Sequence, residues 1–328
     1  MKTALVCGAG GFIGGHMVKR LLDEGYRVTA VDIKPFEDWY QLETGLEVFY
    51  IADFDLCDKD LVDDLIKYNK FDEIYQFAAD MGGAGYIFTG EHDADVMHNS
   101  ATINLTLAKS VAMHSPRSHV FYSSSACVYP EHNQLDPENP NCEESSAYPA
   151  DPDSEYGWEK LFSERMWRAF ARNCGIRVRM ARFHNIFGPH GTWDGGKEKA
   201  PAAMCRKVCM SEGEIEVWGP GNQTRSFLYI DECIEAVRRL MDSEVEEVIN
   251  IGSDEMISIN NLAKMTADIS GKDISIKNVD GPVGVNGRNS DNNLIDAVLG
   301  WRPTSPLRDG MIKTYKWIEE QINDRKSN

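Results

Sequence analysis

The chain has 328 residues, with 42% hydrophobic and 10% aromatic residues, which is typical of a globular protein of about two domains. It carries 52 acidic and 34 basic residues, for a formal net charge of -18. This surplus of acid argues against nucleic acid and anionic membranes as partners, because both bind through surplus Lys and Arg.

Short apolar runs alternate with longer amphipathic stretches over residues 1–180. The expected strands lie at 4–7, 28–31, 73–77, 119–122 and 178–181. The expected helices lie at 12–23, 93–113 and 155–173. This alternation predicts an α/β fold in which a parallel sheet is wound on both faces.

The character of the sequence changes after residue 187. Residues 188–226 are rich in Gly, Pro and Trp and predict a loop-heavy excursion. The apolar segments 227–230 and 248–251 predict a return to the sheet. Residues 252–328 predict further helices, of which the last covers about 306–322.

These patterns predict two domains, the smaller one built from separated pieces of chain. The sheet domain would comprise residues 1–186 plus 227–251. The second domain would comprise residues 187–226 plus 252–328.

The eight cysteines are scattered and form no CxxC pair, so we expect neither a metal site nor disulfides. No apolar run approaches the roughly 18 residues that cross a bilayer, and the chain begins with a strand-like segment. We therefore expect a protein of the reducing cytoplasm that has no signal peptide and no membrane partner.

A glycine-rich turn joins the first expected strand to the first helix. Its glycines are Gly8, Gly11 and Gly14, and the helix opens with Phe12 and Ile13. Glycine permits the tight turn, the close approach of backbone to a pyrophosphate, and the packing of helix on strand. The motif therefore predicts a dinucleotide site.

Two carboxylates refine this prediction. Asp32 ends the second strand, where it can accept hydrogen bonds from ribose hydroxyls and repel a 2'-phosphate, which favours NAD over NADP. Asp55 lies between the strands expected at 28–31 and 73–77 and is expected near the adenine.

Tyr156 and Lys160 are spaced to share one face of a helix. We expect the Lys160 ammonium to lower the pKa of the phenol from about 10 toward neutrality. Tyr156 could then remove a proton from a substrate hydroxyl. The run Ser123–Tyr129 ends the preceding strand, and Ser125 in it can hydrogen-bond the same substrate oxygen.

This combination resembles the extended short-chain dehydrogenase/reductase superfamily, which joins GxxGxxG, a Ser or Thr, and YxxxK. The resemblance covers the whole chain. It implies a Rossmann-type doubly wound parallel sheet with a smaller, discontinuous substrate-binding domain, and NAD as a tightly bound cofactor.

Longer and compositionally unusual segments resemble one family within that superfamily, the GDP-mannose 3,5-epimerases. The segments lie at 78–85, 124–130, 182–189, 191–193, 198–203, 223–227, 250–256 and 287–293. The resemblance implies epimerisation of GDP-mannose at C3 and C5 through a transient 4-ketone, giving GDP-L-galactose and also GDP-L-gulose. It also implies a homodimer.

The family's residue roles carry over by resemblance to matching positions. Cys127 and Lys199 would be the base and the acid that invert C3 and C5. Asn185, Lys207, Arg225 and Arg288 would contact the GDP-sugar, and Gly85 would lie close to the hexose. Segment 197–207 holds four basic residues and one acidic residue, a local cationic site in an acidic protein.

Three alternatives compete with this reading. A C4 epimerase has no use for a second acid/base pair, and a 4,6-dehydratase should carry an acidic pair where Ala126 and Cys127 follow Ser125. A regulatory protein that binds NAD without turnover should lack Tyr156 or Lys160, which are both present.

Two further features bear on the substrate. Asp194 stands where the resemblance leads us to expect a basic residue, which leaves the exact sugar preference open. We expect Trp193 and Trp218 to be packing residues, with the alternative that either one borders the sugar.

Overall fold

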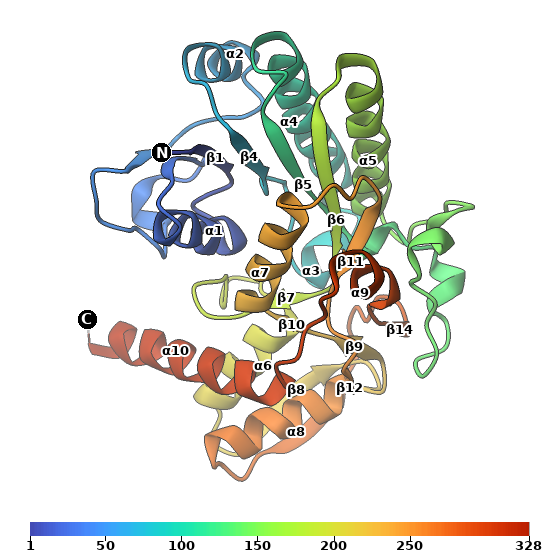
Figure 1. The fold of residues 1–328 in the computed structure, drawn as a ribbon. Coiled ribbons are helices and arrows are strands. Elements are labelled where there is room, and N and C mark those ends of the chain that lie inside the picture. The colour runs from blue at the N-terminus through green and yellow to red at the C-terminus, as the bar shows by residue number, and fades with distance from the viewer. Residues whose placement is uncertain (328) are drawn as a thin grey trace.

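The computed structural model describes residues 1–327. At its centre lies a seven-stranded sheet in which all neighbouring strands run parallel (Figure 1). Its spatial order is β11 (Val248–Ile251), β6 (Arg177–Phe183), β5 (His119–Ser125), β4 (Glu73–Gln76), β1 (Thr3–Cys7), β2 (Arg27–Val31) and β3 (Val48–Ile51). The predicted α/β class is confirmed.

Helices cover both faces of this sheet. One face packs against α1 (Phe12–Asp23) and α7 (Ile230–Met241). The other packs against α2 (Lys59–Tyr68), α4 (Asp93–His114) and α5 (Glu155–Cys174). The predicted helices at 12–23, 93–113 and 155–173 match α1, α4 and α5 to within one residue at their ends.

Strand β1 shows why helices must pack against both faces of the sheet. Ala4 and Val6 pack into the hydrophobic cluster on the α1 side, whereas Leu5 and Cys7 pack into the cluster on the α2 side. Successive side chains of a strand point to opposite faces, so a run that is apolar throughout is buried on both.

The remaining strands form three small sheets. Strand β7 (Ile186–Phe187) pairs with β10 (Leu228–Tyr229), and β8 (Glu214–Trp218) pairs with β13 (Ser275–Val279). Strand β9 (Thr224–Ser226) lies between β12 (Met256–Ser258) and β14 (Gly287–Arg288).

The helices outside the sheet layers lie mainly in the second half of the chain. They are α3 (Ala84–Ile87), α6 (Ala200–Met210), α8 (Ile259–Ser270), α9 (Asn293–Leu299) and α10 (Leu307–Ser327). Four short 3-10 turns complete the fold: η1 (Phe36–Asp38), η2 (Ala126–Val128), η3 (Glu131–Gln134) and η4 (Glu144–Ala147). None of the helices in the described residues is both long enough and apolar enough to pass through a bilayer.

One expectation about the second half was incomplete and another was wrong. Segment 188–226 is rich in loops, as expected, but it also contains α6, β8 and β9. Met204, Cys205 and Val208 form the buried stripe of α6, which the high Gly, Pro and Trp content of the segment obscured. Segment 227–230 does not rejoin the main sheet; β10 pairs with β7, whereas β11 does return beside β6.

The carboxyl ends of four central strands meet at one edge of the sheet. The glycine turn follows β1, residues 77–83 follow β4, the η2 turn follows β5, and Asn185 follows β6. Ligand sites of doubly wound sheets lie outside this edge.

Candidate active site

The turn after β1 is shaped for close contact between backbones. Gly8 has a φ of +79°, and a Cβ there would lie 2.8 Å from the backbone nitrogen of Ala78. A Cβ on Gly14 would lie 2.1 Å from the carbonyl oxygen of Gly8. Gly11 caps α1 without a side-chain hydrogen bond, so the first amides, from Phe12 onward, have no side-chain cap. The turn therefore fits a pyrophosphate.

Asp32 lies directly beside this turn. The amide of Gly8 donates a hydrogen bond to the carbonyl oxygen of Val31, the residue before Asp32. Ile13 is the second residue of α1, the helix that follows the turn. Asp32 is only 7% exposed and accepts a hydrogen bond of 3.0 Å from the Lys34 amide. Burial raises the pKa of Asp32, and backbone hydrogen bonds act against that rise.

Asp55 follows β3 and is half-buried. Its Oδ1 accepts a hydrogen bond of 2.8 Å from the amide of Cys57, so it forms part of a local turn. The amide of Phe54 donates to the carbonyl oxygen of Asp32, which holds the two carboxylate-bearing segments together. Contact of Asp55 with the adenine stays a prediction.

Replacing Gly14 with Ala should push α1 away from the glycine turn, because the new Cβ overlaps the Gly8 oxygen. We expect the purified variant to lose at least about 1 kcal/mol of stability and most of its bound NAD. Chemical denaturation and chromatography of the released cofactor measure both. Gly213→Ala is the control, since a Cβ there meets open space. Unchanged NAD content in Gly14→Ala would contradict this role of the turn.

The structure brings the predicted redox residues together. Ser125 ends β5, and its hydroxyl accepts a hydrogen bond of 3.2 Å from the amide of Cys127. Tyr156 lies in the first turn of α5 and is almost fully buried. A Cβ on Gly157 would lie 2.1 Å from the carbonyl oxygen of Cys127, so this glycine lets α5 press against the η2 turn.

Lys160 lies one helical turn behind Tyr156. Its Nζ donates to the carbonyl oxygen of Ser123 at 3.0 Å and lies 5.6 Å from the centre of the Tyr156 ring. Burial raises the pKa of Tyr156, and the nearby Cys127 and Glu159 add to the rise. Burial also lowers the pKa of Lys160. The predicted lowering of the phenol pKa is therefore wrong, since burial raises it.

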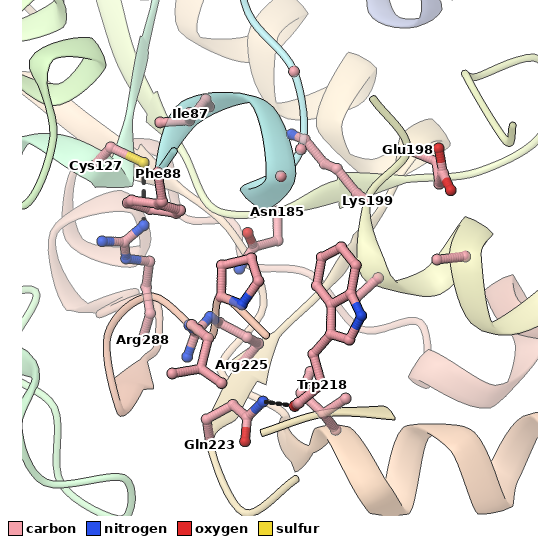
Figure 2. A pocket seen from close by; sticks show the side chains of 18 of the residues that line it. Ile87, Phe88, Cys127, Asn185, Glu198, Lys199, Trp218, Gln223, Arg225 and Arg288 are labelled. Atoms are coloured by element: carbon pink, nitrogen blue, oxygen red, sulfur yellow. Dashed lines mark hydrogen bonds between the residues drawn. The ribbon is translucent and has the colours of Figure 1, made fainter. Parts of the chain in front are cut away.

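A cavity of about 280 Å³ opens beside these residues. Its walls include most of the predicted catalytic and substrate-binding residues: Gly85, Ser125, Cys127, Tyr156, Asn185, Lys199, Lys207, Arg225 and Arg288. Lys160 does not line the cavity itself; its Nζ contacts the carbonyl oxygen of Ser123 and the ring of Tyr156. Figure 2 shows Cys127 and Arg288 on one side of the cavity, with Lys199 and Trp218 on the other.

Lys199 is the residue that caps the N-terminus of α6. Burial lowers its pKa, which favours an amine that can exchange protons. Its neighbour Glu198 is engaged elsewhere, because it accepts hydrogen bonds of 2.6 Å from Arg206 and 2.7 Å from the amide of Gly196.

The other substrate-binding candidates come from several elements. Asn185 has a φ of +48° and donates to the carbonyl oxygen of Ser226 at 3.0 Å. Lys207 donates to the carbonyl oxygen of Glu216 at 2.6 Å, and burial lowers its pKa. Burial lowers the pKa of Arg225 to about 10, and the positive charge of Arg288 adds to this lowering. Lys207 and Arg225 bring positive charge to the wall of the cavity.

Two features of the cavity wall refine what the sequence indicated. Trp218 lines the cavity and is 44% exposed, in line with the alternative that it borders the sugar, whereas Trp193 is buried, as expected of a packing residue. A Cβ on Gly83 would lie 2.4 Å from the carbonyl oxygen of Glu198, so the loop after β4 packs directly on the segment that carries Lys199. The Met-Gly-Gly run was the only signal for this contact.

Asp194 has a structural explanation. Its Oδ2 lies 2.9 Å from Arg325 of α10, and its Oδ1 lies 3.7 Å from Arg206 of α6. The guanidinium of Arg325 also lies 4.2 Å above the ring of Trp193. Asp194 therefore ties the loop before Lys199 to two helices and is not a wall residue of the cavity.

His184 follows β6 and is fully buried, with Nε2 2.9 Å from Asn250 Oδ1. Burial lowers its pKa to about 3.

Below pH 6.5 the unfolded chain takes up a proton at His184 that the folded chain does not, so stability falls as the pH drops toward 3. We expect His184 alone to lower the free energy of unfolding by roughly 3 kcal/mol between pH 7 and pH 4. Urea unfolding of His184→Gln should show a shallower decline; an identical decline would refute the assignment.

Comparison with known proteins adds to the geometry. Residues 4–252 match the family model described as the NAD dependent epimerase/dehydratase family. GDP-mannose 3,5-epimerase 1 of Oryza sativa subsp. indica and GDP-mannose 3,5-epimerase of Arabidopsis thaliana are both 44% identical to the chain over 323 residues. Each alignment covers 98% of this chain and 83% of the relative.

A solved structure shows the same architecture. A point mutant of the UDP-glucuronic acid 4-epimerase of Bacillus cereus, in complex with NAD and a fluorinated UDP-sugar, superposes with a TM-score of 0.82 at 25% identity. The superposition covers 97% of this chain and 99% of that one. On the motifs, the fold and these matches, the chain belongs to the NAD dependent epimerase/dehydratase family and is an NAD-dependent enzyme related to the GDP-mannose 3,5-epimerases.

Proposed function

We propose that this protein converts GDP-mannose to GDP-L-galactose by inverting C3 and C5, with GDP-L-gulose as a second product. The observation that carries the proposal is that one cavity is lined by two chemically distinct sets. Ser125 and Tyr156 suit oxidation and reduction, and Cys127 and Lys199 suit proton transfer. The 44% identity to relatives named GDP-mannose 3,5-epimerase supports the choice of substrate.

The redox set would act at C4. The Gly8–Gly14 turn and Asp32 would hold NAD, which would supply the two-electron oxidation and reduction at C4. Tyr156 takes the proton of the C4 hydroxyl and later returns it, while Ser125 hydrogen-bonds the same oxygen. Lys160, fixed on Ser123, holds its Nζ 5.6 Å from the centre of the Tyr156 ring, where a positive charge acts against the rise that burial causes in the pKa of the phenol.

The second set would act on the neighbouring carbons. A ketone at C4 acidifies the protons on C3 and C5, because the electron pair left behind moves onto the ketone oxygen. Cys127 takes the proton from one face of the ring, and Lys199 returns a proton on the opposite face. The lowered pKa of Lys199 keeps proton donation accessible near neutral pH.

The cationic wall would hold the diphosphate of the substrate. Arg225 and Lys207 supply positive charge, and Asn185 supplies an amide at the same wall. Guanidinium groups suit this role because they bind phosphate oxygens in a bidentate manner. Gly85 lines the cavity without a side chain of its own, and a Cβ built there would already contact the ring of Trp218 at 3.7 Å, so glycine keeps this part of the cavity free for the hexose.

The three alternative functions account for fewer of the residues that line the cavity or support it. A C4 epimerase, the activity named for the Bacillus cereus protein, would leave Cys127 and Lys199 without a task. A 4,6-dehydratase would need an acid where Ala126 stands after Ser125. A non-catalytic NAD-binding protein would not need a buried Tyr156 and Lys160 beside an open cavity.

A homodimer and a cytoplasmic location belong to the same proposal. Helices α4 and α5 pack side by side and expose large apolar side chains: Met97, Leu105, Trp158 and Phe162. A second copy of the chain could cover this face. All eight cysteines are free, which supports a reducing compartment.

The proposal is tested by incubating the purified protein with GDP-mannose and, separately, with UDP-glucuronic acid. We expect the first to yield GDP-L-galactose and GDP-L-gulose, identified by chromatography against standards, and the second to remain unchanged. Conversion of the UDP-sugar alone would favour the C4 epimerase, and conversion of neither would favour the non-catalytic protein.

A further inference from the structure

Arg288 makes a contact that substrate binding does not explain. Its Nη1 lies 3.1 Å from the sulfur of Cys127, as Figure 2 shows. A neutral thiol is a weak hydrogen-bond acceptor, whereas a thiolate accepts a strong, charge-assisted bond from a guanidinium. The geometry of this contact therefore suits a thiolate acceptor better than a neutral thiol.

The guanidinium is fixed in that place by two other residues. Its Nε donates to Gln134 Oε1 at 2.6 Å, and its Nη2 lies 3.0 Å from Asp153 Oδ2. Gln134 is fully buried and is itself anchored by donating to the carbonyl oxygens of Tyr129 and Pro130. The arginine therefore cannot turn away from the sulfur without breaking both anchors.

The burial of Arg288 and the charges around Cys127 also favour an anionic sulfur. The side chain of Arg288 is 7% exposed and that of Asp153 is 6% exposed, so the pair is removed from water. A buried cation is favourable only when anions or strong acceptors surround it. Further charged and titratable groups interact electrostatically with Cys127 from three other elements: Tyr156 and Lys160 of α5, Lys199 before α6, and Arg225 of β9. All of them except the phenol are cationic.

We propose that Arg288 is a catalytic residue that holds Cys127 as a thiolate, and that Asp153 and Gln134 are positioning residues that aim the guanidinium at the sulfur. This rests on the proposed function, in which Cys127 is the base. The thiolate takes a proton from the sugar carbon and forms an S–H bond, while the C–H electron pair moves onto the ketone oxygen. Arg288 keeps its protons throughout.

The test measures the ionisation of Cys127 without turnover. Iodoacetamide reacts with the thiolate, so the alkylation rate of Cys127 at pH 7 relative to pH 10 reports its ionised fraction. Mass spectrometry of the Cys127 peptide follows the reaction in the full-length protein. Cys174, which is exposed at the end of α5, is the reference within each sample.

We expect Arg288→Met to lower the pH 7 to pH 10 rate ratio of Cys127 by at least about tenfold, with Cys174 unchanged. Because Arg288→Met leaves Asp153 buried and unpaired, the same comparison is made between Asp153→Asn and the double variant Asp153→Asn/Arg288→Met. An unchanged ratio in both comparisons would overturn the role of Arg288.

Asp153 is tested by two substitutions of different character. Asp153→Asn keeps an oxygen that can accept from the guanidinium, so its ratio should match or exceed that of the wild type. Asp153→Ala removes the anchor, so its ratio should fall several-fold. Equal ratios in the two variants would overturn the positioning role. Since alkylation needs no substrate, failure of the proposed function in a turnover assay would leave these results interpretable.

Discussion

Replacing Tyr156 with Phe is expected to lower kcat by about 10²- to 10⁴-fold and to leave binding of NAD and GDP-mannose nearly unchanged. The phenol is buried at the cavity wall next to Ser125, and it is the group best placed to exchange a proton with the C4 hydroxyl. Without the ketone, C3 and C5 stay unactivated, so every product should be lost together. Steady-state kinetics and calorimetric binding measure the two effects.

The matched control is Tyr68→Phe, at the exposed end of α2. It should keep full activity and stability. A Tyr156→Phe variant with wild-type kcat would show that another group carries the proton at C4.

The second large effect is expected for Cys127→Ser. A hydroxyl ionises far less readily than a thiol, so proton removal from C3 and C5 should slow by about 10²- to 10⁴-fold. Oxidation at C4 depends on Tyr156 and should persist, because this substitution leaves the redox set intact. We expect retained binding of NAD and GDP-mannose, measured by calorimetry, and loss of both inverted sugars, measured by NMR.

Cys174→Ser, at the exposed end of α5, is the control and should behave as the wild type. If Cys127→Ser remained fully active, Cys127 would have no part in the reaction.

Much of the fold could be predicted because local signals and tertiary packing agree. The strands of the central sheet are largely apolar, and α1, α4 and α5 carry clear helical patterns. The errors lie where this agreement fails. Helix α6 starts at a proline-containing turn inside a glycine-rich segment, and β10 is only two residues long. Pairing of so short a strand is decided by its spatial neighbour, which composition does not reveal.

The residues of the site could be proposed from motifs, but their environments could not. Spacing places Tyr156 and Lys160 on one helix face, yet it does not show that burial raises the pKa of the phenol. Sequence also gives no sign that Arg288 contacts Cys127, because 161 positions separate them. Such contacts follow from the return of β14 to the cavity, which only the folded chain defines.

The most direct test of the account is turnover of GDP-mannose in deuterated water, followed by NMR of the sugar ring. Inversion through a 4-ketone replaces the protons on C3 and C5 with solvent deuterium, while the hydrogen on C4 is kept. We predict deuterium at C3 and C5 of the product, and neither label in Tyr156→Phe or Cys127→Ser. Inversion at C4 with no deuterium at C3 or C5 would contradict the account.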